Sequence, residues 1–382
     1  MRVITAPLFC MAWLALGGCA DTGYLAQTVR GHLALQAATR PVDAWLQDPA
    51  TPPALRQQLQ QAQRIRRYAV TALQLPDNAS YSRYADLQRN AVVWNVVAAP
   101  EFSLQPRTWC FPVTGCIAYR GYFAEKDATA QADALRAQGL DVTVYGVPAY
   151  STLGWTNWMG GDPLLNTFVN RGETELARLV FHELAHQQIY VKDDTRFNES
   201  FATAVERLGL AQWLTESGRE AQRSEHERQE KMRAQFRQLS VATRRELALA
   251  YEEKMPLAHD LYARSAIKNE AYVNFGKAYE VLRQSWGLKP GQPSGYDAWV
   301  AKANNASFAA VASYDEFVPG FEALFVAQSR DWQRFYDAVS RLAQLPQTER
   351  DIRLGAAAQM LPQDLAGQSR AAVAMQRATN NF

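Results

Sequence analysis

The segment His-Glu-Leu-Ala-His at 182–186 places two histidines four residues apart, with a glutamate directly after the first. Residues i and i+4 share one face of an α-helix, so the imidazoles of His182 and His186 can bind one metal ion. Glu183 lies one position further round, where its carboxylate can take a proton from a water molecule activated by that ion. The pattern predicts zinc-assisted hydrolysis, with Glu183 as the general base.

The sequence around this segment is typical of a helix. Apolar residues recur at helical spacing: Leu176, Leu179, Val180 and Leu184. Gly172 is followed by Glu173 and Glu175, and negative charge is favoured in the first turn of a helix. The alternative is a packed structural helix that carries two histidines without binding a metal.

Two histidines leave a tetrahedral zinc ion one protein ligand short if the last position holds water. Glu199 and Glu206 follow the motif and lie seven residues apart, so one helical face can present both. Either carboxylate could be the third ligand. If Glu206 is not the ligand, it either hydrogen-bonds a ligating histidine or lies on the surface.

The first 18 residues read as an export signal. Arg2 precedes an uncharged run at 3–16 that is too short to span a membrane, and Leu-Gly-Gly-Cys follows at 16–19. This resembles the lipobox of bacterial lipoproteins, which implies cleavage before Cys19, acylation of its thiol and amine, and anchoring in the cell envelope. Ala20 favours the periplasmic face of the outer membrane. The alternative is an ordinary secretory signal with an incidental cysteine.

Cysteine usage agrees with export. Cys10 leaves with the signal and Cys19 carries lipid, so Cys110 and Cys116 remain as an even pair in an oxidising compartment. We expect them to form a small disulfide loop, since its Pro and Gly suit a tight turn. Half of a zinc knuckle is the alternative, but no partner pair follows.

Composition describes a globular protein of 382 residues, 48% hydrophobic and 20% charged. The formal net charge is only +2, and no polybasic block argues for nucleic acid as a partner. Periodicity predicts a mainly helical α+β fold, with an α/β part at 19–210 that carries the metal helices and a mainly helical part at 211–382. Expected helices cover 25–46, 54–75, 125–138, 257–286 and 318–342, with a hairpin at 212–253 that turns near Ser240. Expected strands cover 91–97, 117–123 and 140–147.

A turn-rich segment connects the last of these strands to the metal helix. Many metallopeptidases bind an extended substrate there by strand addition. We therefore consider four residues as a substrate-binding strand: Tyr150, Ser151, Thr152 and Leu153. An ordinary edge strand and loop is the alternative. Further on, Asn198 is expected to cap the second metal helix.

The segments 182–187 and 198–206 resemble the two zinc helices of the gluzincin aminopeptidases. The resemblance implies a gluzincin-like zinc-peptidase core and maps the third ligand onto Glu199. The loop between the two segments is shorter here, which keeps Glu206 open as an alternative.

The rest of the chain is similar to the predicted aminopeptidases found as bacterial lipoproteins. The similarity lies in 81–84, 93–95, 109–112, 115–116, 119–123, 149–155, 162–165 and 304–306. It implies a zinc-dependent envelope peptidase acting on peptide substrates. The Gly-x-Met-Glu-Asn segment that holds a free amine in better-known gluzincins is missing, so endopeptidase action stays open. The alternative is a non-catalytic metal-containing lipoprotein that serves as an envelope binding or assembly factor; the intact Glu183 favours the enzyme. The sequence does not indicate an oligomeric state.

Overall fold

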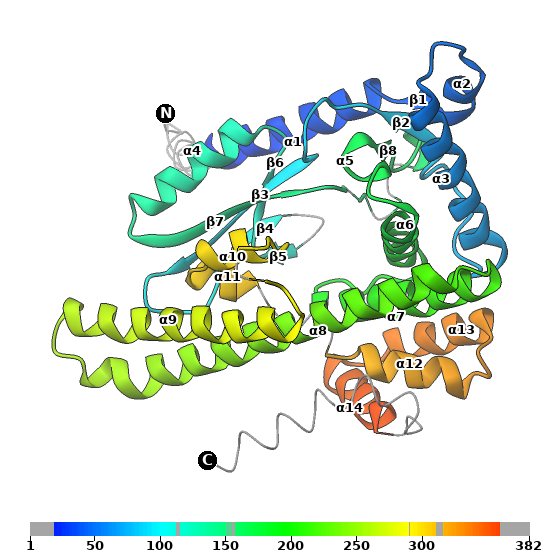
Figure 1. The fold of residues 1–382 in the computed structure, drawn as a ribbon. Helices are drawn as coiled ribbons and strands as arrows, with labels where there is room; N and C mark the ends of the chain where they lie inside the picture. Colours follow the sequence, from blue (N-terminus) through cyan, green and yellow to red (C-terminus); the bar gives the residue numbers. More distant parts are fainter. Residues whose placement is uncertain are drawn as a thin grey trace, which may run out of the picture.

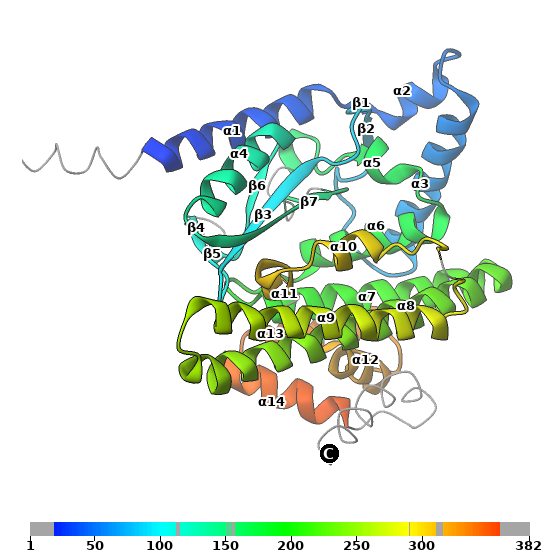
Figure 2. The same cartoon turned by 60° about the vertical axis from the view of Figure 1, so that its left-hand side comes forward.

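The computed structural model describes residues 19–111, 115–149, 151–152, 154, 157–289, 291–310 and 316–359. Helices surround small sheets, which confirms the predicted mainly helical α+β class (Figure 1). In the views of Figures 1 and 2, α1 (Cys19–Ala37) runs along the top of the molecule and the last helices lie at the bottom.

The helix expected at 25–46 is in fact two helices. After α1 the chain forms the short strand β1 (Arg40–Pro41), and α2 (Val42–Gln47) follows. Pro41 pairs with Arg83 in a sheet, which ends the first helix earlier than its apolar spacing predicts. The next predicted helix is confirmed as α3 (Pro53–Thr71), whose inward face includes Leu59 and Ile65.

The main sheet is antiparallel, in the order β6–β3–β7. It contains β3 (Val93–Pro100), β6 (Arg120–Tyr122) and β7 (Leu140–Val147), close to the three predicted strands. One face packs against α4 (Glu125–Arg136), and the other packs its alanine and valine side chains against α11 (Asn305–Ala310).

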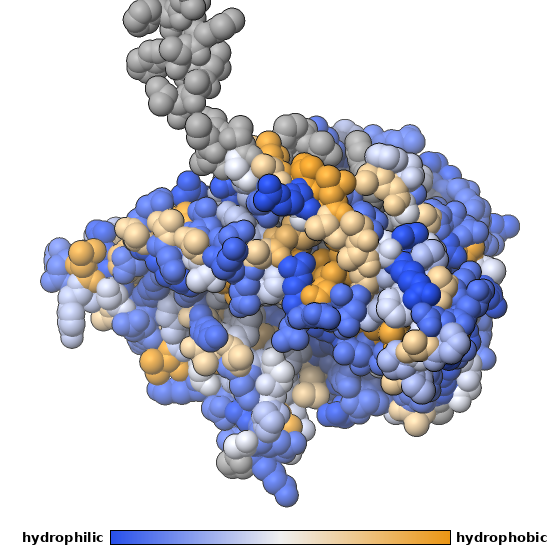
Figure 3. All heavy atoms as spheres, turned by 90° about the horizontal axis from the view of Figure 1, so that it is seen from above, coloured by the Kyte–Doolittle hydropathy of each residue, from blue (hydrophilic) through white to orange (hydrophobic). Residues whose placement is uncertain are grey.

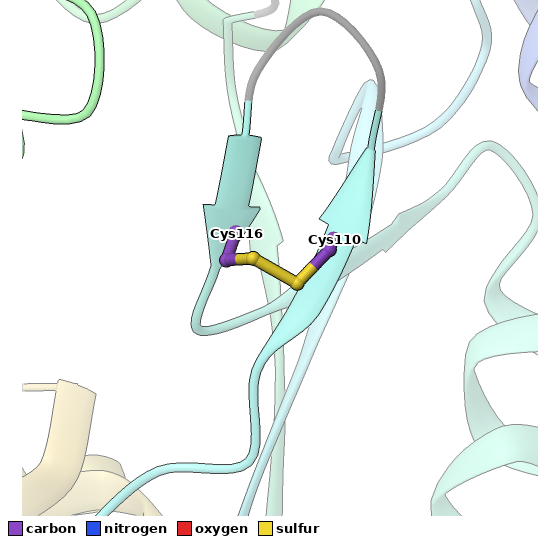
Figure 4. Close-up of a disulfide and its surroundings, with 2 residues drawn as sticks. All are labelled: Cys110 and Cys116. Atoms are coloured by element: carbon purple, nitrogen blue, oxygen red, sulfur yellow. A yellow bond between two sulfur atoms is a disulfide. The ribbon is translucent and has the colours of Figure 1, made fainter.

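A second, three-stranded sheet joins β1, β2 (Arg83–Ala85) and β8 (Leu164–Leu165). The hairpin of β4 (Trp109–Phe111) and β5 (Gly115–Ile117) carries the expected disulfide: Cys110 and Cys116 are direct strand partners and are covalently joined (Figure 4). The short helices η1 (Asn157–Met159) and α5 (Asn166–Val169) lead to the helix that carries the His-Glu-Leu-Ala-His segment.

Two long helices, α6 (Glu173–Gln188) and α7 (Thr195–Glu216), cross the centre of the molecule. The largest core cluster packs them against α3 and against the C-terminal helices α12 (Val318–Ala327), α13 (Trp332–Ala343) and α14 (Gln347–Ala358). The single helix expected at 318–342 is therefore two helices, separated by residues 328–331, where Ser329 and Arg330 have positive φ.

The predicted turn near Ser240 is wrong. α8 (Glu220–Leu249) runs straight through this position, where the serine is buried and its hydroxyl donates to the carbonyl of Phe236. A π-helical turn at Ala250–Lys254 and a 3-10 turn at Met255–Leu257 lead to the antiparallel α9 (Leu261–Ser285), and α10 (Asp297–Ala301) follows. Among the described helices, none combines the length and apolarity that crossing a membrane requires.

Candidate metal centre

The predicted metal helix is α6. Gly172 stands before its first turn with φ +90°, a conformation that glycine adopts without strain. Leu176, Val180 and Leu184 are buried in the core, as their spacing predicts. This packing fixes the rotation of α6, so that His182 and His186 face α7 rather than solvent.

The start of α7 differs from the prediction. Asp194, not Asn198, caps the helix: its carboxylate accepts the backbone N–H of Phe197 at 3.1 Å. Arg350 of α14 also donates to this carboxylate at 2.6 Å. Asn198 lies inside the helix and binds both the N–H and the carbonyl of Val191, so it holds the connection from α6 instead. These contacts set the register in which α7 faces α6.

Three side chains that are typical zinc ligands meet between the two helices. The carboxylate of Glu199 lies 3.5 Å from Nε2 of His182 and 3.7 Å from Nε2 of His186. One candidate ligand atom from each residue lies within 4.8 Å of the other two. Two imidazoles and one carboxylate are the protein donor set of many catalytic zinc sites, in which a water molecule is the fourth ligand.

Glu206 occupies a different position from Glu199. Its carboxylate lies 2.9 Å from Nδ1 of His182 and accepts a hydrogen bond from Arg178 at 2.7 Å. Although burial opposes ionisation, the hydrogen bond with His182 and the charge of Arg178 lower the pKa of Glu206 to about 2. An ionised Glu206 that accepts the Nδ1 proton leaves Nε2 of His182 free to bind a metal.

The electrostatics of the centre favour a cation between the helices. Burial opposes charge on His182, yet hydrogen bonds with Glu199 and Glu206 raise its pKa to about 10. Burial and the nearby His182 lower the pKa of His186 to about 4, so this ring is neutral and able to coordinate. Without metal, the proton on His182 supplies the positive charge that the carboxylates favour.

Glu183 is partly buried and directly follows His182, one of the three candidate ligands. Burial raises its pKa to about 7, an effect that Glu199 and Asp162 increase and that His182 and a hydrogen bond from Ser151 reduce. A carboxylate with this pKa can both accept and release a proton near neutral pH, as a general base requires.

Ser151, the hydrogen-bond partner of Glu183, and its neighbour Thr152 lie outside the strands of the described residues. The backbone N–H and the hydroxyl of Thr152 donate to Asp162 at 3.0 and 2.7 Å, and Gln187 of α6 donates to the same carboxylate at 3.0 Å. The other two residues of the expected substrate strand, Tyr150 and Leu153, lie outside the described part of the chain.

Sequence reasoning missed the roles of Arg178, Asp162 and Gln187. Arg178 lies one helical turn before His182, a spacing that could have indicated a shared partner. Asp162 stands in a turn-rich segment that gives no sign of burial, yet it is 1% exposed.

The chain was compared with family models, with curated proteins and with solved structures. The model of the family described as "Putative aminopeptidase" matches residues 23–354, a span that includes His182, His186 and Glu199. No curated protein and no solved structure matched the chain. The match covers most of the sequence, and the chain therefore belongs to this aminopeptidase family.

Proposed function

We propose that this protein is a zinc-dependent peptidase of the bacterial cell envelope that removes residues from the amino terminus of peptides. One observation carries the proposal. Candidate ligand atoms of His182, His186 and Glu199 lie within 4.8 Å of one another, and Glu183 follows the first ligand directly. A site that only stabilised the fold would more often close with a fourth protein ligand and would need no base.

The two histidines would hold zinc through Nε2, and Glu199 would hold it through its carboxylate. When bound, zinc acts as a Lewis acid that makes water more acidic and polarises the carbonyl of the scissile bond. Glu183 takes a proton from the attacking water and passes it to the nitrogen of the departing amine. Glu206 keeps His182 in the tautomer that presents Nε2, and Arg178 keeps Glu206 ionised.

We propose that the segment 150–153 forms part of the substrate site. The hydrogen bond between Ser151 and Glu183 supports this position next to the reacting groups. The N–H of Thr152 already donates to Asp162, so this residue cannot offer it to an added peptide strand. Substrate would therefore bind this segment through other atoms.

The lipobox-like sequence at 16–19 supports export and a lipid anchor at Cys19. A peptidase held in this way would act on peptides in the periplasm. The disulfide between Cys110 and Cys116 is consistent with an oxidising compartment.

The proposal is tested with purified protein loaded with zinc and two sets of peptides, one with free and one with acetylated amino termini. Mass spectrometry should detect release of the first residue from the free peptides only. Chelation should abolish this activity and added zinc should restore it. Internal cleavage of acetylated peptides would replace the aminopeptidase assignment by an endopeptidase one, and no cleavage of either set would contradict the proposal.

A further inference from the structure

The helix α1 has its apolar side turned to solvent. Leu25, Val29 and Leu33 repeat every four residues and are 45%, 58% and 50% exposed. The other described side chains on this outer side are alanines and one charged residue: Ala26, Arg30, Ala34 and Ala37. We call these seven residues the α1 stripe. Figure 3, which views the molecule from the side of α1, shows an elongated hydrophobic patch on this face. Surface helices ordinarily present polar residues there.

Polar groups fix the opposite side of α1 to the body of the protein. Gln27 donates to the carbonyl of Gly121 at 3.2 Å and accepts the N–H of Phe123 at 3.3 Å. Near the other end of the helix, Gln36 donates to the carbonyl of Gly161 at 2.9 Å. These three contacts prevent α1 from rotating, so the α1 stripe is a built surface rather than a core face displaced from its partner.

The position of Cys19 indicates what covers this surface. Cys19 is the first residue of α1, and it is the cysteine of the lipobox-like sequence at 16–19. At a rise of about 1.5 Å per residue, Leu25 lies roughly 9 Å from Cys19 along the helix. A lipid on Cys19 would therefore bring the bilayer surface to the beginning of the α1 stripe.

We propose that α1 lies flat in the surface of the bilayer and inserts the α1 stripe among the lipid acyl chains. A helix with a long apolar side and a single arginine fits this environment, since the guanidinium of Arg30 can reach the headgroups while its stem stays in apolar surroundings. The inference rests on the proposed anchor at Cys19, but not on the proposed peptidase activity.

Membrane binding through α1 would also orient the rest of the protein. In the views of Figures 1 and 2, α12 to α14 lie on the side of the molecule opposite α1, and α6 and α7 lie between. Docking through α1 therefore holds the C-terminal helices away from the membrane and fixes the orientation of the metal centre relative to it.

The test measures the membrane depth of single positions. The acylated protein is reconstituted into vesicles of phosphatidylethanolamine and phosphatidylglycerol with an environment-sensitive fluorophore on Val29→Cys. The matched control carries the fluorophore on Ile352→Cys in α14, a position that is 66% exposed. Cys110 and Cys116 are paired, so the introduced thiol is the one available for labelling. Spin-labelled lipid should quench position 29 several-fold more than position 352.

Acylation of Cys19 is verified in the same samples from the mass of the N-terminal peptide. Equal, weak quenching at both positions in acylated protein would overturn the proposal. So would efficient cross-linking between two Val29→Cys chains without vesicles, because a second copy would then cover the α1 stripe.

A second measurement does not depend on the anchor. With Cys19→Ser protein, the double variant Val29→Asp, Leu33→Asp should bind vesicles about tenfold more weakly, whereas Ile352→Asp should bind unchanged. Equal binding of the double variant and its parent would also overturn the proposal. Zinc content should be the same in all these proteins, so failure here is distinct from failure of the metal centre.

Discussion

Replacing Glu206 by Gln tests whether this carboxylate prepares His182 for the proposed zinc ion. Gln keeps the size of the side chain and can still accept the Nδ1 proton of His182, but it removes the charge. Glu206 is 4% exposed, so water cannot replace the lost interaction. Arg178 would retain its ion pair with Glu175, whose carboxylate lies 3.2 Å from Nε of Arg178. The substitution therefore isolates the effect of one buried carboxylate.

The expected loss of stability follows from the pKa of Glu206, which is about 2 in the folded protein against an ordinary value of 4.5. Because the pKa is lowered, the ionised group stabilises the fold at every pH above 4.5, the pKa in the unfolded chain. This stabilisation disappears as the pH falls from 4.5 towards 2. The shift corresponds to about 3 kcal/mol at neutral pH in metal-free protein. Loss of a carboxylate behind a ligating histidine ordinarily weakens metal binding by about 10- to 100-fold.

Two assays measure these effects. Urea unfolding with a chelator present gives the free energy of unfolding, and competition with a coloured chelator gives the zinc affinity. The matched control is Glu225→Gln on the exposed side of α8, which should change neither quantity. Zinc affinity and stability both equal to wild type in Glu206→Gln would refute the assigned role of Glu206.

Three further predictions concern the same region and the hairpin. Glu199→Ala should weaken zinc binding by more than the roughly 10- to 100-fold expected for Glu206→Gln, because it removes a ligand rather than the support of one; the same competition assay measures this. The pKa of Glu183 is raised from 4.5 to about 7. The protonated side chain therefore stabilises the fold fully below pH 4.5, and this stabilisation is lost as the pH rises through 7. Metal-free Glu183→Gln should consequently be about 3 kcal/mol more stable than wild type near pH 8 and equal to it near pH 4, as urea unfolding at both pH values would show. Replacing Cys110 and Cys116 by serine should reduce stability by about 2 kcal/mol, the value expected for so short a loop, and equal unfolding midpoints would contradict it.

Local signals in the sequence are sufficient to predict most of the helices and strands around the candidate site. The apolar spacing of α6 predicted both its existence and the face that it buries, because a helix in a core must turn one stripe inward. The same reasoning gave β3, β7 and α4, where short turn signals separate clear periodicities.

Long-range partners explain where sequence reasoning failed. The sequence predicts a turn near Ser240, but buried apolar neighbours on both sides keep α8 helical through it. Asp194 rather than Asn198 caps α7, and part of the reason is Arg350, which lies 156 residues away in the chain. The positions of Glu199 and Glu206 likewise depend on the packing of α7 against α6, which places Glu199 near Nε2 and Glu206 near Nδ1 of His182.

Zinc content and peptide hydrolysis of wild type and Glu183→Gln, measured side by side, test the central claim most directly. Both proteins should bind one zinc ion per chain, since Glu183 is not a proposed ligand. Hydrolysis by Glu183→Gln should be about 100- to 10,000-fold slower, the ordinary contribution of a general base. Bound zinc with equal cleavage by the two proteins, or no bound zinc in either, would contradict the assignment of this centre as a zinc peptidase site.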